Sequence, residues 1–406
     1  MEKLPLPKTY PRSTLKGKES IRIYGQDFPS SWSDLKVELE SARVNLNGEA
    51  AKHLERAALI LCPNLIFHAW IERIFKAHTE GWSTVSLAGC ASSGKTFSVS
   101  ILALLFWLTN PRERGVVLAS TTIDSLKARI WGQLVAIIGE CPYELPTQIY
   151  HSKPPCILYD KDFPINGIFT APLIKGKSEE TLGNLIGRKY KEGFMVVVDE
   201  STDVAPGFID AKANWEISAP FFQLWALGNS KDQEDPHGQL CTPKNGWGSI
   251  NPDYDTEWET NQGICLYFDG MRSPALDDLR LVGKLISRRD IDAGLEQYGD
   301  TSPKFWRFVR GFWANSTEEQ TVVSKALIQK TKADTKVMLS GDMKIPMAAL
   351  DPGFGGDACI LRFGDLVSST DGGLVVLQFG PIYTLDINVK SSEPVEYQIL
   401  YQTKAL

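Results

Sequence analysis

Gly89-Cys-Ala-Ser-Ser-Gly-Lys-Thr96 is the stretch of this 406-residue chain that decides its fold. It has the spacing G-x-x-x-x-G-K-[ST], follows the apolar run 85–88 and leads into the apolar segment 97–108, a predicted helix. Between a strand and a helix, such a loop turns its backbone N–H groups towards a phosphate, and the helix directs its positive end at the same anion. We therefore expect Lys95 to neutralise the β and γ phosphates and Thr96 to hold Mg²⁺ through its hydroxyl.

Every residue of this loop is expected to contact the nucleotide: Gly89, Cys90, Ala91, Ser92, Ser93, Gly94, Lys95 and Thr96. The alternative interpretation is a Gly/Ser-rich surface turn with a chance lysine. The strand before the loop and the helix after it favour the phosphate site.

A pair of carboxylates forms the second motif. The apolar run 194–198, Phe-Met-Val-Val-Val, is followed directly by Asp199 and Glu200. Such a run predicts a strand buried on both faces, and ligands of parallel sheets bind at the carboxyl ends of the strands. We expect Asp199 to hold Mg²⁺ through water and Glu200 to polarise the water that attacks the γ-phosphate. The alternative is a helix cap after a core strand.

A third apolar run, 221–227, ends in Gly228-Asn229-Ser230. Asn229 is expected to sense the γ-phosphate and relay its loss, whereas a simple Asn-rich turn is the alternative. Further strands are predicted at 115–120, 165–171 and 264–268, and helices in two segments of 32–61 and at 64–78, 121–138 and 279–298. Strands that alternate with helices predict a doubly wound α/β sheet.

In many nucleotide motors the helix before the P-loop strand packs near the adenine, and the predicted helix 64–78 has this place in the chain. Trp70 or His68 on this helix could stack on that base. A buried core aromatic is the favoured alternative for Trp70.

Composition limits the class of protein. The formal net charge of −6 gives no global basic field, so contacts to a nucleic acid must come from a local groove. Residues 1–30 are predicted to form an extended arm without a secretory signal, and the longest apolar run, 101–108, is too short to span a bilayer. We expect a protein of the cytoplasm, or of the cytoplasm of a host cell.

Seven cysteines occur without a C-x-x-C pair, so a zinc site is not supported. Four of them are expected to be small core residues of a protein in a reducing compartment: Cys62, Cys156, Cys265 and Cys359. Cys90, inside the loop, is either oxidisable or a small side chain that points away from the nucleotide.

Two basic stretches leave alternatives open. In 304–313, Lys304, Arg307 and Arg310 are interleaved with aromatic residues, which suits stacking of bases or contact with a phosphate backbone. A strand that packs its aromatics under the sheet is the alternative. The glycine-punctuated segment 175–188 suits phosphate contact or a solvated loop.

A new unit begins near residue 343. The apolar segment 348–350 ends in Asp351, a glycine-rich turn follows, and two more strands and a helix are predicted. Asp351 stands where the first metal-binding carboxylate of an RNase H-like nuclease stands, and such sites need three or four carboxylates around two metal ions. The strand that should bring the second carboxylate is absent, so we expect an incomplete nuclease in this chain.

Taken in this order, the P-loop, the Val-Val-Val-Asp-Glu strand, the Leu-Gly-Asn-Ser strand end and the Asp-Pro-Gly-Phe-Gly-Gly-Asp unit resemble the large terminase subunit of tailed bacteriophages. The resemblance covers roughly residues 60–406. It implies an ATPase domain of the additional-strand, helicase-like type and an RNase H-like nuclease domain. It also implies double-stranded DNA, the portal protein and the small terminase subunit as partners, and an active homo-oligomeric ring outside any membrane.

The resemblance assigns roles by position. Lys95 and Thr96 match the phosphate and Mg²⁺ ligands, Asp199 and Glu200 match the metal ligand and the catalytic carboxylate, Asn229 falls in the coupling motif, and Asp351 matches the first nuclease carboxylate, catalytic and metal-binding. Many family members have an arginine within the P-loop, where this chain has Ala91-Ser92. Arg129 and Arg188 are therefore the candidates for the arginine finger. No clear adenine-reading glutamine precedes the first strand.

The expected organisation is a lead-in over 1–60, an ATPase domain over 61–315, a linker over 316–342 and an incomplete nuclease domain over 343–406. The expected function is translocation of viral DNA into a procapsid, driven by hydrolysis of ATP. One alternative is a helicase or remodelling enzyme that acts on free nucleic acid; another is an assembly protein that binds ATP without hydrolysing it.

Overall fold

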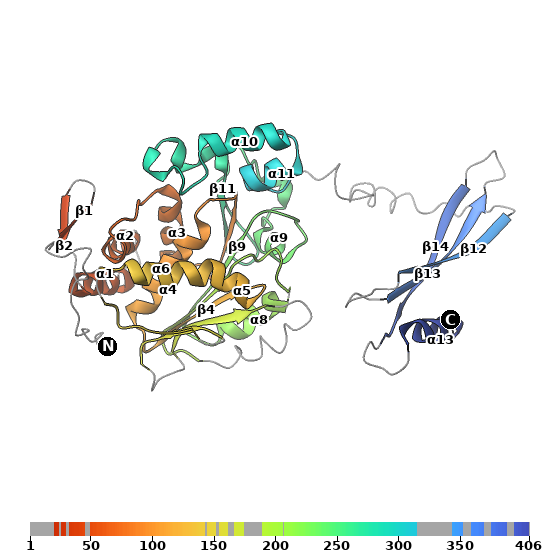
Figure 1. Cartoon of the computed structure of the whole chain (residues 1–406), viewed down its shortest axis with the longest axis horizontal. Coiled ribbons are helices and arrows are strands. Elements are labelled where there is room, and N and C mark those ends of the chain that lie inside the picture. Colours follow the sequence, from red (N-terminus) through yellow and green to blue (C-terminus); the bar gives the residue numbers. More distant parts are fainter. Residues whose placement is uncertain are drawn as a thin grey trace. The chain divides into compact units, whose positions relative to one another are not determined.

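The chain divides into two compact units, residues 1–319 and 320–406 (Figure 1). The computed structural model describes residues 20–23, 26–29, 32–44, 49–142, 144–151, 154–160, 166–173, 189–205, 207–314, 343–351, 359–368, 375–387 and 394–405. The predicted linker, 316–342, lies outside these residues, so the predicted domain boundaries stay predictions.

A nine-stranded sheet forms the centre of the first unit, in the order β10-β11-β3-β9-β8-β4-β7-β6-β5. The strands are β3 (Thr84–Gly89), β4 (Arg114–Ser120), β5 (Gln148–Tyr150), β6 (Cys156–Leu158), β7 (Gly167–Pro172), β8 (Gly193–Val198), β9 (Phe221–Gly228), β10 (Glu257–Glu259) and β11 (Ile264–Phe268). From β11 to β7 the neighbouring strands are parallel, whereas β10 is antiparallel to β11, β6 is antiparallel to β7, and β5 is antiparallel to β6. The predicted doubly wound α/β fold is confirmed, and β9 is the additional strand between β3 and β8.

Helices cover both faces of this sheet (Figure 1). On one face lie α1 (Trp32–Val44), α2 (Ala50–Leu61), α3 (Ala69–Thr79), α4 (Lys95–Thr109), α5 (Ile123–Leu126), the π-helical turn Lys127–Trp131 and α6 (Gly132–Glu140). On the other lie α8 (Gly207–Glu216) and α9 (Pro236–Cys241). Neighbouring residues of a strand pack on opposite faces: Val116 contacts the first set of helices and Val117 the second. This burial on both faces explains why the central strands are continuous apolar runs.

Three sequence predictions need correction. The helix predicted at 279–298 begins only at Arg288, as α10 (Arg288–Tyr298), because a capping box between Ser287 and Asp290 starts it there. Single 3-10 turns precede it: Gly270–Arg272, Pro274–Leu276 and Leu279–Leu281. The strand alternative for 304–313 is wrong, since the chain forms α11 (Pro303–Phe305) and a π-helical turn, Trp306–Arg310. The predicted extended arm contains an antiparallel strand pair, β1 (Ser20–Ile23) and β2 (Gln26–Pro29).

The second unit contains an antiparallel sheet in the order β12-β13-β14. Its elements are β12 (Met343–Asp351), β13 (Cys359–Ser368), β14 (Val375–Leu385) and α13 (Val395–Ala405). Asp351 ends β12 opposite Ile360, as the sequence predicts for a strand-end carboxylate. Among the described residues of the whole chain, no helix is long and apolar enough to cross a bilayer.

The fully buried His237 on α9 leads to a prediction about stability. Its Nδ1 lies 2.8 Å from the Ser201 hydroxyl, and burial, with a smaller effect of Lys95, lowers its pKa to about 3. Because an unfolded histidine titrates near 6.5, the unfolded chain takes up a proton first as the pH falls from about 6.5 to 3, and the free energy of unfolding decreases. We expect His237→Gln to reduce this pH dependence by about 1.4 kcal/mol per pH unit in that window, measured by urea denaturation at pH 7.5 and 5.5. Equal pH dependence in both proteins contradicts the burial of a neutral imidazole.

Candidate phosphate-binding site

The loop after β3 is held open by backbone contacts to distant parts of the chain. Cys90 N–H donates to the carbonyl of Phe268 (3.0 Å) and Ala91 N–H donates to that of Phe308 (2.8 Å). Ser92 and Gly94 have positive φ angles of 53° and 70°. A left-handed backbone favours glycine at the second of these positions, as the motif provides.

Lys95, the first residue of α4, is the central cation of the loop. Its ammonium donates to the carbonyls of Gly89 (3.0 Å) and Cys90 (2.9 Å), to Ser93 Oγ (2.9 Å) and to Asn229 Oδ1 (3.0 Å). Burial lowers the pKa of Lys95 to about 8. A buried cation surrounded by weak neutral acceptors gains most from an anionic ligand. Asn229, predicted to sense the phosphate, thus contacts Lys95, the lysine predicted to bind it, directly.

Thr96 and Asp199 meet across the site, because β3 and β8 end at the same edge of the sheet. Thr96 Oγ1 donates to Asp199 Oδ1 (3.3 Å), and the other carboxylate oxygen, Oδ2, is buried without a hydrogen-bond partner. Burial, together with Glu200, raises the pKa of Asp199 to about 6, while Arg129, Lys95 and Thr96 oppose the rise. An orphaned buried carboxylate oxygen beside a hydroxyl suits Mg²⁺, which Thr96 and Asp199 would hold together with water and phosphate oxygens.

Glu200 follows directly, in the left-handed region at φ 56°. Its carboxylate forms an ion pair with the guanidinium of Arg129, which projects from the π-helical turn Lys127–Trp131. A non-glycine residue in this backbone region is uncommon and clusters at functional sites. The strained turn directs the carboxylate into the cavity instead of along the strand.

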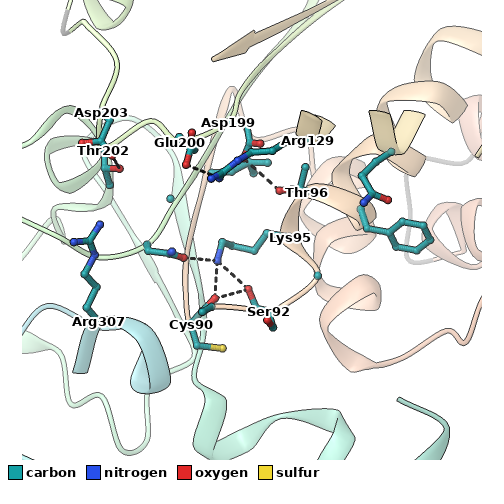
Figure 2. A pocket seen from close by; sticks show the side chains of 18 of the residues that line it. Cys90, Ser92, Lys95, Thr96, Arg129, Asp199, Glu200, Thr202, Asp203 and Arg307 are labelled. Atoms are coloured by element: carbon teal, nitrogen blue, oxygen red, sulfur yellow. Dashed lines mark hydrogen bonds and ion pairs between the residues drawn. The ribbon is translucent and has the colours of Figure 1, made fainter. Parts of the chain in front are cut away.

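One cavity of about 410 Å³ contains these groups (Figure 2). Of the residues that the sequence predicts for the site, the following line it: Cys90, Ala91, Ser92, Ser93, Gly94, Lys95, Thr96, Arg129, Asp199, Glu200 and Asn229. The carbonyl oxygen of Gly89 accepts a hydrogen bond from the ammonium of Lys95, which lines this cavity. Arg188 and the segment 175–188 lie outside the described residues, and Asp351 belongs to the second unit.

The sequence did not predict several lining residues: Phe97, Gln133, Thr202, Asp203, Lys284 and Arg307. The segment 304–313 does supply a basic residue to the site, but its other features are structural. Arg310 pairs with the buried Asp269 at 3.1 Å, and Lys304 is exposed. Long-range contacts bring this segment to the site: the Phe308 carbonyl accepts a hydrogen bond from Ala91 N–H, and the Gly311 carbonyl accepts one from the Ser230 hydroxyl.

A second pocket, of about 440 Å³, adjoins the first and shares Gly94, Phe97, Gln133 and Lys284 with it. His68 lines this pocket, and its buried Nδ1 has no hydrogen-bond partner; burial lowers the pKa of His68 to about 4. Trp70 instead stacks on Phe268 with ring centroids 5.1 Å apart, so the buried-core alternative is right for this residue. The pocket has the volume for a nucleoside next to the phosphate loop.

The second unit is less suited to metal binding than the cavity in the first unit. Among the residues described in the two units, no group of three or more His, Cys, Asp or Glu side chains is arranged around a common point. Two-metal nuclease sites need such a group. Among the described residues, Asp351 is therefore a strand-end carboxylate that belongs to no such group.

Free cysteines complete the comparison with the sequence. Cys265 and Cys359 are buried, as predicted, whereas Cys62 and Cys156 are only partly buried. Cys90 is completely buried, and burial raises its pKa to about 12, so its thiol is protonated and unreactive. This agrees with a small side chain rather than an oxidisable one.

Gly311 gives a direct test of the packing behind the loop. It has φ 70°, and a Cβ at this position lies 2.1 Å from the Cys90 nitrogen. We expect Gly311→Ala to cost about 3 kcal/mol or more of stability and to displace the loop, lowering nucleotide affinity. Gly81→Ala is the matched control, since Gly81 has φ 79° but nothing within 4 Å of the added Cβ. Thermal denaturation and nucleotide titration of both variants measure the difference; equal effects would show that the contact with Cys90 is unimportant.

Comparison with known proteins gives three findings. No protein-family model matches the chain. No curated protein matches it either. Solved structures that are similar to it include the large terminase of bacteriophage HK97 (14% identity over 84% of this chain and 66% of that one, TM-score 0.46) and that of a thermophilic bacteriophage (14%, 75% and 64%, TM-score 0.39). The large terminase ATPase domain of Thermus phage P74-26 is a third (11%, 63% and 97%, TM-score 0.42). The chain spans just under two thirds of the length of the first two of these structures.

Proposed function

We propose that this chain is the ATP-hydrolysing subunit of a viral DNA-packaging motor, a large terminase. The observation that supports this most is the meeting of the loop and the acidic strand end: Thr96 lies 3.3 Å from Asp199 in a cavity that Lys95 and Glu200 also line. A lysine, a hydroxyl and two carboxylates in this arrangement suit a nucleoside triphosphate with its Mg²⁺. The motif order along the chain, described above, suits a packaging motor in particular.

In the proposed reaction, Lys95 and the loop N–H groups bind the β and γ phosphates. Thr96 and Asp199 would hold Mg²⁺, which when bound would supply positive charge against the phosphate oxygens. Glu200 leaves its ion pair with Arg129, orients water opposite the leaving β-phosphate oxygen and accepts its proton. Loss of the γ-phosphate then changes the Lys95–Asn229 contact, and β9 transmits this change to the polymer-binding parts of the motor.

The proposed partners are double-stranded DNA, the portal protein and the small terminase subunit, with a homo-oligomeric ring as the active form in the cytoplasm of the host cell. The net charge of −6 requires that the DNA contacts be local. For the second unit we propose the start of an RNase H-like fold with Asp351 as its first carboxylate. Cleavage of DNA then needs further carboxylates in addition to Asp351.

Reconstituted packaging tests the function. Purified protein, small subunit, procapsids with portal and linear DNA are incubated with Mg²⁺ and ATP, and DNA protected from nuclease is measured. Protection that requires ATP and disappears with Glu200→Gln supports the proposal. Efficient strand separation of a forked duplex without procapsids favours the helicase alternative, and tight ATP binding without turnover in the full assembly favours the non-catalytic one.

A further inference from the structure

The cavity holds more positive charge than its motif accounts for. Among the described residues that line it, four are cationic: Lys95, Arg129, Lys284 and Arg307. Lys95 is held by its loop and by Asn229, and Arg129 is paired with Glu200. Arg307 is different: it is half-buried, and its Nε is buried without a hydrogen-bond partner. A buried guanidinium N–H without an acceptor costs free energy, which an anionic ligand in the cavity removes.

The turn that carries Arg307 is bonded to both phosphate-sensing segments. The carbonyl of Phe308, next in the chain, accepts the N–H of Ala91 in the loop at 2.8 Å. The carbonyl of Gly311 accepts the hydroxyl of Ser230, beside Asn229, at 2.7 Å. The ion pair of Arg310 with Asp269 fixes the turn from behind. Arg307 is therefore positioned relative to the loop by short backbone connections within one chain.

The Arg307 side chain lines one side of the cavity. Figure 2 shows its guanidinium directed towards Thr202 and Asp203, on the far side of Lys95 from Thr96. The ring of Phe308 lies 4.9 Å below the guanidinium and limits its movement. Asp203 is already bound by Lys231 at 2.8 Å, so its charge is shared. The guanidinium thus faces the cavity with hydrogen-bonding capacity to spare.

We propose that Arg307 binds the terminal phosphate of ATP from within the same chain; the inference rests on the nucleotide site of the proposed function. Its planar guanidinium donates paired hydrogen bonds to phosphate oxygens, which lysine cannot do in the same geometry. ADP lacks the phosphate group that Arg307 contacts. Arg307 therefore distinguishes ATP from ADP, and release of phosphate is reported through its turn to Ala91 and Ser230. Neither Arg129, which is paired with Glu200, nor Arg188 is needed for this contact.

The test compares affinities for a non-hydrolysable ATP analogue and for ADP, both with Mg²⁺, by calorimetric titration. Arg307→Ala is expected to weaken binding of the analogue by about 10- to 100-fold and to change ADP affinity by less than about threefold. Lys304→Ala is the matched control, because Lys304 is exposed in the same segment and does not line the cavity. It is expected to change neither affinity. Should the alanine variant fold poorly, Arg307→Lys, which keeps the charge, is expected to lower the analogue-to-ADP affinity ratio by about 3- to 10-fold.

Failure of this inference and failure of the proposed function give different results. If the unmodified chain binds neither nucleotide, the nucleotide site itself is wrong. If it binds and hydrolyses ATP but Arg307→Ala and Arg307→Lys leave the affinity ratio unchanged, only the role of Arg307 is wrong. Mixing Arg307→Ala with Glu200→Gln chains in the assembled motor tests the origin of the contact. If Arg307 contacts the nucleotide of its own chain, the mixture does not recover hydrolysis. Recovery would mean that Arg307 contacts the nucleotide of a neighbouring subunit and would overturn the inference.

Discussion

Glu200→Gln is expected to lower the rate of ATP hydrolysis by about 100- to 10,000-fold, the range for loss of a positioned general base. The carboxylate lies at the mouth of the strained turn after β8, in the cavity that Lys95 and Thr96 line. Glutamine keeps the size and some hydrogen bonding of the side chain but cannot take the proton from water. Phosphate release under saturating ATP measures the effect.

Binding of ATP should survive this substitution. In the proposed mode of binding, Lys95 and the loop hold the phosphates, and loss of the Glu200 charge in the same cavity removes a repulsion from the polyphosphate. We expect affinity for an ATP analogue to stay within about threefold of the unmodified chain or to increase. Glu216→Gln, at the exposed end of α8 and paired with Lys212 at 3.1 Å, is the control with unchanged turnover. Turnover of Glu200→Gln at the unmodified rate would remove Glu200 from the mechanism.

How much of this site the sequence could predict depends on the distance over which each contact acts. The loop and the Asp199–Glu200 pair are local motifs, and the rule that parallel strands end at one edge brings them together. Pairing β9 between β3 and β8 also follows from the family resemblance. These parts required no knowledge of side-chain packing.

Other parts depend on contacts that no local pattern records. Arg307 reaches the cavity through long-range contacts of its turn, such as the hydrogen bond that the carbonyl of Phe308 accepts from Ala91, more than two hundred residues earlier in the chain. The mixture of aromatic and basic residues in the segment 304–313 was equally compatible with a strand. The late start of α10 is different, since the spacing Ser287-Arg-Arg-Asp290 is a readable capping box. Attention to that signal would have placed the helix correctly.

The alternation of burial along the central strands explains a further success. Val116 and Val117 pack on opposite sets of helices, and so do Val196 and Val197. A strand with both faces covered must be apolar throughout, so the runs 115–120 and 194–198 were recognisable as parallel strands. In α4, burial removes the helical periodicity from the sequence. All residues from Ser98 to Thr109 are buried, so this part of the helix has no polar face.

Lys95→Ala is expected to weaken binding of ATP by about 30- to 5,000-fold, since truncation of one partner of a buried charge pair costs about 2–5 kcal/mol. In the structure the ammonium is buried and already desolvated, with the carbonyl of Cys90 and the amide of Asn229 as partners. The Lys95 ammonium is therefore desolvated when the chain folds. Binding of the triphosphate does not include the free energy of that desolvation, so more of the electrostatic attraction contributes to affinity. Alanine removes the cation and also frees the carbonyl oxygens of the loop, whose partial negative charge then faces the phosphates.

Two measurements separate this effect from general damage to the fold. Without nucleotide, Lys95→Ala should unfold at a temperature close to that of the unmodified chain, because its loss removes a buried charge as well as four hydrogen bonds to neutral groups. With ATP and Mg²⁺ at about one hundred times the dissociation constant, the unmodified chain gains about 2.7 kcal/mol of stability and the variant gains almost none. Lys244→Ala, an exposed residue paired with Glu259 at 3.4 Å, should keep the full gain. An equal gain in Lys95→Ala would mean that the triphosphate is bound elsewhere, because the loop 89–96 contains no second ammonium group.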